Sequence, residues 1–345
     1  MKKTKKLIIC TLASFLVIIV GALFAPTWTA SIQEKNSINV LEQVEVNGSD
    51  HEIMIRGNDI GNPVLLFVHG GPGSSEIPYA SRYQDLLEKN FTIVQYDQRA
   101  SGKSYHFTED YSNLSTDLLV EDLLAMSDYI SKRLHREKII LIGHSAGTYI
   151  ALQAAHQSPE QYEAYIGIGQ MSDIIDSELE SLAFCIDQAK ERGNMEDVIY
   201  LQGLEEDISE GNTVTPRNYV MKYGGTARLI ESPDGNSLNN LLSSDYNLLD
   251  VIRYNYGISY SQKMLIPDLL KKPLPDLVKT LELPVFFVMG KYDYHTTYNT
   301  AKEYFDNLDA KQKEFITFDQ SAHYPQFEEK EKFYEWMVST FSPKK

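Results

Sequence analysis

The sequence is poor in cysteine and in basic residues, and both shortages narrow what the chain can do. Its two cysteines are Cys10, which lies in an apolar leader, and Cys185, which has no partner, so a disulfide framework is excluded. The 345 residues include 32 Lys and Arg against 48 Asp and Glu, a formal net charge of -16. Because phosphate binding needs clustered cations, we expect no nucleic-acid partner. Most of the surplus carboxylates are expected to serve solubility.

The sequence also lacks internal repeats, low-complexity segments and any spacing of His, Cys, Asp and Glu that is typical of a metal site. We therefore expect no metal and no cofactor. A chain of 345 residues is long enough for one large α/β domain with an insertion, or for two modest domains.

One long apolar run, 7–24, contains no charge and follows four lysines within the first six positions. Its length lies between that of a secretory signal and that of a spanning helix. A cleavage site needs small residues one and three positions before the cut, but Leu23 precedes Ala25 and Trp28 precedes Ala30 at the third position. We therefore expect residues 1–30 to be an uncleaved, single-pass membrane anchor with the rest of the chain outside. The alternative is a cleaved signal and a secreted protein.

Short apolar runs predict a mostly parallel sheet. Segments 44–46 and 51–56 alternate around Asn47 and Gly48, as the strands of a β-hairpin do. Later runs do not alternate, and strands of that kind are buried on both faces of a parallel sheet that helices cover. Three of these runs are 64–68, 91–96 and 138–142, and the sheet continues with 165–169, 285–289 and 314–318.

Helical patterns lie between these strands. Residues 114–134 are predicted to bury one apolar stripe, because large apolar residues recur there every three or four positions. The stripe consists of Leu119, Leu123, Met126 and Ile130. Ser158 followed by Pro159 predicts another helix start, and 327–341 predicts a closing amphipathic helix.

The alternation of strand and helix stops between residues 172 and 282. Helical patterns dominate this interval, including 175–192 and 197–208. We therefore expect a core in two parts, 31–171 and 283–345, with 172–282 as an insertion. The predicted fold class is α/β, a mostly parallel sheet with helices on both faces.

The segment 139–150, IILIGHSAGTYI, predicts a strand, a sharp turn and a helix in direct succession. The turn holds Ser145 out from the backbone at the end of the strand, while Gly143 and Gly147 leave room for the helix to approach. A serine in this position lies beside a helix N-terminus and acts as a nucleophile if a base reaches it. Because Gly-x-Ser-x-Gly also occurs by chance, the prediction that Ser145 is a nucleophile depends on the flanking strand and helix.

A serine nucleophile needs an imidazole to take its proton and a carboxylate to orient that imidazole. Residues just past different parallel strands meet at one edge of a sheet, and Asp293 and His323 each follow a predicted strand. The chain order Ser145, Asp293, His323 is the one that this architecture uses. His295 is the competing base, and Asp319 is the competing acid, although it lies close to His323 along the chain.

The glycine-rich segment 69–73, HGGPG, follows the strand 64–68 and predicts backbone donors for an oxyanion. Paired glycines let amides face a ligand with no side chain in the way. The second donor is expected to be the amide of Ala146, directly after the nucleophile. Asp97, which follows another strand, is expected to be structural and tied to its own turn.

Five segments carry a family resemblance. They are HGGPG at 69–73, YDQRASGKS at 96–104, GHSAGT at 143–148, GKYD at 290–293 and SAHYPQFEE at 321–329. Together they resemble the α/β-hydrolase fold and, within it, the proline iminopeptidase (prolyl aminopeptidase) family of serine peptidases. The resemblance covers about residues 44–341 and implies that the insertion is a helical cap over the site. It implies Ser145 as nucleophile, Asp293 and His323 as its partners, and the amides of Gly71 and Ala146 as oxyanion donors.

The chain departs from this family at two positions, which leaves its substrate open. Ala146 stands where family members usually carry an aromatic residue, and Ala100 stands where they carry glycine. The family also holds the substrate's free amine with cap carboxylates. The candidates here are Glu178, Glu180, Glu205, Glu206 and Glu231. We expect a serine hydrolase that forms an acyl-enzyme, as an aminopeptidase on short peptides or, alternatively, as a carboxylesterase on small acyl esters.

Overall fold

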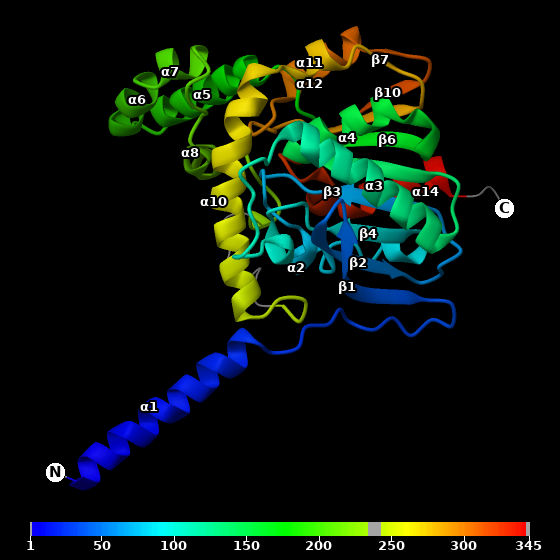
Figure 1. Cartoon of the computed structure of the whole chain (residues 1–345). Helices are drawn as coiled ribbons and strands as arrows, with labels where there is room; N and C mark the ends of the chain where they lie inside the picture. Colours follow the sequence, from blue (N-terminus) through cyan, green and yellow to red (C-terminus); the bar gives the residue numbers. More distant parts are fainter. Residues whose placement is uncertain (1, 234–242, 343–345) are drawn as a thin grey trace.

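One large β-sheet organises the structure. The computed structural model describes residues 2–233 and 243–342, and within them eight strands form a sheet in the order β1-β2-β4-β3-β5-β6-β8-β10 (Figure 1). β2 is antiparallel to β1 and β4, and the other neighbouring pairs are parallel. The strands are β1 Ile38–Val46, β2 Ser49–Gly57, β3 Val64–Val68, β4 Thr92–Tyr96, β5 Ile139–His144, β6 Tyr162–Ile168, β8 Val285–Gly290 and β10 Lys313–Phe318. β7 Thr280–Leu281 and β9 Asp309–Ala310 pair separately.

The β1–β2 hairpin forms where the sequence predicts it. Val46 pairs with Ser49, so only Asn47 and Gly48 lie in the turn. Their φ angles are 49° and 74°. A two-residue type I′ turn requires positive φ at both positions, which Asn and Gly tolerate.

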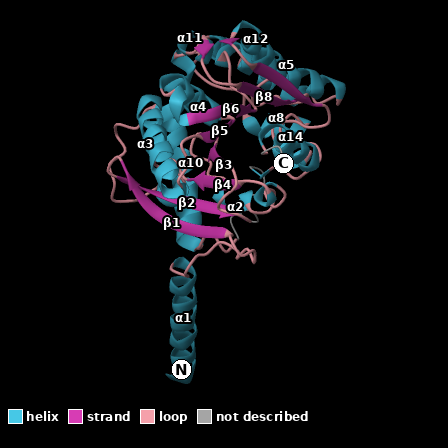
Figure 2. Ribbon diagram, turned by 90° about the vertical axis from the view of Figure 1, so that its right-hand side faces the viewer, coloured by secondary structure: helices cyan, strands magenta, loops and turns pink. Residues whose placement is uncertain are grey.

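The parallel strands are apolar on both faces, because helices cover both sides of the sheet. In β5, Ile139 and Leu141 pack into a core cluster that also contains residues of α3 and α4. Ile140 and Ile142 pack into a second cluster, which contains residues of α14. Figure 2 shows α3 and α4 on one side of the sheet and α14 on the other. This two-sided burial explains why these strands do not alternate in sequence.

The helices of the core follow the predicted pattern closely. α3 is capped by Ser115, whose hydroxyl accepts a hydrogen bond from the Leu118 amide, and it buries the whole predicted stripe. The core helices are α2 Ile77–Ala80, α3 Thr116–Leu134, α4 Ala146–Gln157, α12 Tyr298–Asn307, α13 Pro325–Glu328 and α14 Lys330–Phe341. The 3₁₀ turns are η1 Leu87–Lys89, η2 Gly102–Ser104 and η3 Pro159–Gln161.

Two helix predictions are wrong in detail. The helix expected from Ser158 is only the three-residue turn η3, because β6 begins at Tyr162 and leaves no room for a longer helix. The helix expected over 197–208 is divided into α6 and α7 around Gly203, whose amide closes the end of α6 by bonding back to the Ile199 and Tyr200 carbonyls.

Among the described residues, six helices lie between β6 and β8, and we call them the inserted helices. They are α5 Ile174–Glu191, α6 Met195–Gln202, α7 Glu205–Ser209, α8 Arg217–Tyr223, α10 Leu248–Lys271 and α11 Leu274–Leu277. α5, α6 and α8 share a small core of their own around Leu182, Cys185 and Val198. The long helix α10 runs along one side of the core and touches η2, α3 and α5 (yellow in Figure 1).

The N-terminal helix α1, Lys2–Leu23, projects away from the rest of the chain in both views (Figures 1 and 2). The part from Thr4 to Leu23 has a mean hydropathy of 2.5, and its apolar window is 0% buried. By length and composition, this helix is able to cross a membrane, and a secretory signal would have the same properties.

Candidate active site

Ser145 occupies a strained turn between β5 and α4. Its backbone has φ 53° and ψ -127°, a conformation that L-residues rarely adopt. The turn is possible because glycines surround it: a Cβ on Gly143 would lie 2.7 Å from the Thr148 Cα, and a Cβ on Gly147 would overlap the Val68 carbonyl oxygen. The strand, turn and helix therefore meet with no space for other side chains, and the turn holds Ser145 at the N-terminus of α4.

Hydrogen bonds fix the backbone of this turn. The Ser145 amide donates to the Ile168 carbonyl oxygen of β6 at 2.9 Å. The Thr148 amide and hydroxyl both donate to the Ser145 carbonyl oxygen, at 2.8 and 2.6 Å. The hydroxyl group of Ser145 is thus carried on a backbone that is tied to both the sheet and the following helix.

His323 and Asp293 form a buried pair. The distance between His323 Nδ1 and Asp293 Oδ2 is 2.9 Å, and the residues are 2% and 1% exposed. Asp293 also accepts hydrogen bonds from the His295 and Thr296 amides and from the Thr296 hydroxyl, at 2.9 to 3.0 Å. These donors orient the carboxylate, which in turn orients the imidazole so that its Nε2 side is left for another partner.

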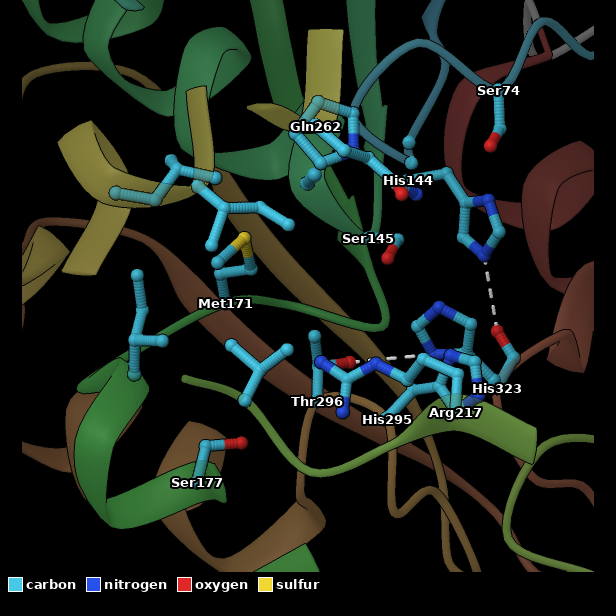
Figure 3. Close-up of a pocket in the computed structure, with 18 of the residues that line it drawn as sticks. Ser74, His144, Ser145, Met171, Ser177, Arg217, Gln262, His295, Thr296 and His323 are labelled. Carbon is cyan, nitrogen blue, oxygen red and sulfur yellow. Dashed lines mark hydrogen bonds between the residues drawn. The ribbon is translucent and has the colours of Figure 1, made fainter. Parts of the chain in front are cut away.

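Ser145 and His323 line one cavity, as Figure 3 shows. Within the described residues, no hydrogen bond joins the Ser145 hydroxyl to the His323 ring. Catalytic hydrogen bonds are often long before substrate binds and tighten in the complex. The roles of Ser145, Asp293 and His323 in catalysis stay predictions.

The competing acid and base are placed differently. His295 lies beside His323, with ring centroids 4.7 Å apart, but its Nε2 is 2.8 Å from the Thr226 hydroxyl. Burial lowers the pKa of His295 well below its usual value, so this ring is neutral. Asp319 is exposed at the end of β10 and does not line the cavity.

The glycine turn after β3 lies directly against Ser145. A Cβ on Gly70 would lie 2.7 Å from the Ser145 Cβ, and Gly71 has φ 117°, which favours glycine. Gly71 and Ala146 both line the cavity. Neither amide donates a hydrogen bond to another of the described residues, so both are available to an oxyanion.

Sequence reasoning missed a second pair, Glu76 and His144. Glu76 Oε1 lies 2.6 Å from His144 Nδ1, and His144 Nε2 lies 3.1 Å from the His323 carbonyl oxygen (Figure 3). His144 therefore links the nucleophile turn to the backbone of His323. In the sequence, only the position of His144 directly before Ser145 could have indicated this pair, because Glu76 is 68 residues away along the chain.

Asp97 is structural, but it reaches beyond its own turn. It accepts hydrogen bonds from the Ser75 hydroxyl, from the Lys103 amide at 2.7 Å and from the Tyr246 hydroxyl at 2.7 Å. It thereby joins the glycine turn to the segment that precedes α10. Burial raises the pKa of Asp97 to about 7, although its hydrogen-bond donors act in the opposite direction.

The cavity has a volume of about 210 Å³ and is mostly apolar. Its charged lining residues are Glu76, Glu178 and Arg217, apart from the histidines. Of the five carboxylates proposed for amine binding, Glu178 alone lines the cavity, among the residues that the structure describes. The other four are Glu180, Glu205, Glu206 and Glu231.

Comparison with known proteins supports a hydrolase. The family model of the alpha/beta hydrolase fold matches residues 63–188. A probable aminopeptidase of Bacillus subtilis is 28% identical over 301 residues, covering 86% of this chain and 95% of that protein. A proline iminopeptidase of Heyndrickxia coagulans is 27% identical over 285 residues, covering 80% of this chain and 89% of that protein.

The same fold is found in solved structures. The proline iminopeptidase of Mycobacterium smegmatis has a TM-score of 0.64 and 15% sequence identity, covering 88% of this chain and 97% of that one. The predicted α/β-hydrolase fold, with a mostly parallel sheet and helices on both faces, is therefore confirmed.

The raised pKa of Asp97 predicts how stability depends on pH. Because the folded-state pKa of about 7 exceeds the ordinary value of 3.8, the unfolded chain ionises first as pH rises. The stability that protonated Asp97 contributes is present below about pH 4 and is lost as pH rises through about 7. Relative to Asp97→Asn, the wild-type free energy of unfolding should fall by up to about 4 kcal/mol over this interval.

Urea unfolding of the full-length chain between pH 4 and 8 measures this difference. Glu52, whose charge also raises the pKa of Asp97, is present in both proteins and paired with Lys103. Parallel stability curves for the two proteins would contradict a raised pKa at Asp97.

Proposed function

We propose that this chain, a hydrolase with the α/β-hydrolase fold that resembles the proline iminopeptidases, is a serine aminopeptidase that acts on short peptides through an acyl-enzyme. The observation that carries the proposal is the His323–Asp293 hydrogen bond of 2.9 Å beside a cavity into which the strained turn presents Ser145. The aminopeptidase character rests on the similarity to the Bacillus and Heyndrickxia proteins.

The proposed reaction begins when Ser145 Oγ attacks the carbonyl carbon of the first peptide bond. His323 Nε2 takes the hydroxyl proton, and Asp293 stabilises the resulting imidazolium. The carbonyl oxygen becomes an oxyanion, which the amides of Gly71 and Ala146 stabilise. When the C–N bond breaks, His323 returns the proton to the leaving amine, and water then releases the acyl group by the reverse proton path.

We propose that residues 172–282 form a cap over this cavity, between core segments 31–171 and 283–345. Residues of this interval supply much of the apolar wall: Ile174, Met221, Ile266 and Leu269 from its helices, and Val214 from the loop before α8. A small covered cavity admits short substrates, excludes folded proteins and strengthens the electrostatic interactions inside it.

A carboxylesterase is the second candidate. It is favoured by the mostly apolar lining and by Ala146, which leaves the space beside the nucleophile without an aromatic ring. It is also favoured by Glu178, since this carboxylate is already paired with Arg217 at 2.5 Å and is less available to a substrate amine.

Substitution of the nucleophile tests the proposed chemistry. Ser145→Ala should lower kcat for alanine p-nitroanilide by at least about 10³-fold, because no acyl-enzyme can form. Ser172→Ala is the matched control, since Ser172 lines the same cavity and its hydroxyl has no hydrogen-bond partner among the described residues. The control should retain activity within about threefold, as measured by release of p-nitroaniline.

The choice of substrate separates the two candidates. An aminopeptidase hydrolyses alanine p-nitroanilide and loses activity when the amine of the substrate is acetylated. Hydrolysis of p-nitrophenyl butyrate alone, or indifference to the acetyl group, would contradict the aminopeptidase and favour the esterase.

We further propose that α1 is an uncleaved membrane anchor and that the rest of the chain lies outside the cell. The segment after α1 is bound to the folded domain, because Asn247 donates to the Ala25 carbonyl oxygen at 3.0 Å and Arg56 donates to the Thr29 hydroxyl at 2.7 Å. Only Phe24 separates α1 from the first of these contacts, so an anchored domain sits at the membrane surface.

Charge placed in the middle of α1 tests the anchor. Wild-type protein should stay in the membrane pellet after alkaline carbonate extraction, with a mass that includes α1. Leu16→Arg combined with Val17→Arg should move it to the soluble fraction or prevent its export, because each central arginine costs about 2.5–3.5 kcal/mol. Thr4→Arg, at the end of the helix, should change nothing. A protein released with its N-terminus after Ala25 or Ala30 would contradict the anchor.

A further inference from the structure

The carboxylates that line the cavity already have partners. Glu76 lies 2.6 Å from His144 Nδ1. Glu178 accepts hydrogen bonds from the Thr215 amide at 2.9 Å and from both terminal nitrogens of Arg217, at 3.0 and 2.5 Å. Its side chain is only 4% exposed. Glu178 is therefore neutralised by a two-point contact with a guanidinium group.

Arg217, in contrast, retains unused donors. A guanidinium carries five N–H groups. Nη1 donates to Glu178 and to the Thr215 carbonyl oxygen at 3.3 Å, and Nη2 donates once to Glu178. The Nε–H and the second Nη2–H have no partner among the residues that the structure describes. The Arg217 side chain is 38% exposed, so these donors remain accessible.

Arg217 also belongs to the catalytic end of the cavity. It lines the cavity together with Ser145, His295 and His323 (Figure 3). Its positive charge also lowers the pKa of the His295 ring, after the larger effects of burial and of His323. A substrate that is bound for attack by Ser145 therefore lies near the positive charge of Arg217.

We infer that Arg217 binds a carboxylate of the substrate, so that the substrate is a short peptide bearing a free carboxylate close to its scissile bond. This inference rests on the proposed aminopeptidase function. The planar guanidinium fork matches a carboxylate, and Glu178 holds the fork in place while leaving one side of it open. The carboxylate is either the C-terminus of a dipeptide or an acidic side chain on the residue that is released.

Paired substrates test this role in the full-length, detergent-solubilised enzyme. Ala-Ala and Ala-Ala amide differ only in the C-terminal carboxylate, and the p-nitroanilides of Glu and Gln differ only in a side-chain carboxylate. Wild type should hydrolyse the carboxylate-bearing member of one pair faster than its neutral partner. The pair that shows this preference tells whether the recognised carboxylate is a C-terminus or a side chain. Arg217→Gln should reduce kcat/KM for that member by about 10- to 100-fold, mainly through KM, since a charged hydrogen bond is lost. Turnover of alanine p-nitroanilide, which carries no carboxylate, should fall less than turnover of that member.

Two further variants separate binding from folding. Arg217→Gln leaves the Glu178 charge buried without its partner, so the double variant Glu178→Gln with Arg217→Gln restores a neutral pair and should show the same loss of carboxylate preference. Arg192→Gln removes an exposed cation directly after α5, outside the cavity, and should behave as wild type.

Equal losses on all substrates, or a wild type with no preference within either pair, would contradict carboxylate binding by Arg217. No turnover of any free-amine substrate would instead contradict the aminopeptidase proposal. In that case p-nitrophenyl hemisuccinate and p-nitrophenyl butyrate form the deciding pair: a loss on the hemisuccinate alone in Arg217→Gln supports carboxylate binding, and equal losses contradict it.

Discussion

The close approach of three backbone segments around Ser145 is the constraint on which the site depends. β5 ends at His144, α4 begins at Ala146, and the glycine turn after β3 passes beside the serine itself. No side chain fits between these segments at Gly70, Gly143 or Gly147. The strain of the serine backbone is offset by its hydrogen bonds to β6 and α4, so the hydroxyl stays at a fixed position relative to the sheet.

Buried hydrogen bonds also connect the segments around Ser145 to other parts of the cavity wall. His144 connects the nucleophile turn to the backbone of His323, and Asp97 connects the glycine turn to Tyr246 before α10. These contacts cross between segments that are far apart in sequence. Among the described charged residues that line the cavity, Arg217 keeps two unused donors, and we propose that these bind the substrate.

Much of the fold was predictable because buried strands and helix faces are apolar in recognisable patterns. β3 spans the predicted 64–68, since a strand covered on both faces is a continuous apolar run with clear ends. β5 extends two residues beyond its predicted end, because Gly143 and His144 are not apolar although both are in the strand. The helix expected at Ser158 failed because a capping pattern says nothing about the distance to the next strand.

The contacts that give the cavity its charge pattern were not predictable in this way. Glu178 was one of five equal candidates for amine binding, and nothing local distinguished it. Its partner Arg217 is 39 residues away on another helix, and its pairing depends on how α5 and α8 pack. The order of Ser145, Asp293 and His323 was visible because parallel strands end at a common edge, whereas loops and inserted helices follow no comparable rule.

The most direct test of the account is peptide mapping by mass spectrometry after treatment with a fluorophosphonate, which labels only an activated serine. The account predicts one adduct, on Ser145, and a labelling rate that falls by at least about 10²-fold in folded His323→Gln protein, because the base that activates the hydroxyl is gone. An adduct at another serine, or labelling of Ser145 at an unchanged rate without His323, would contradict it.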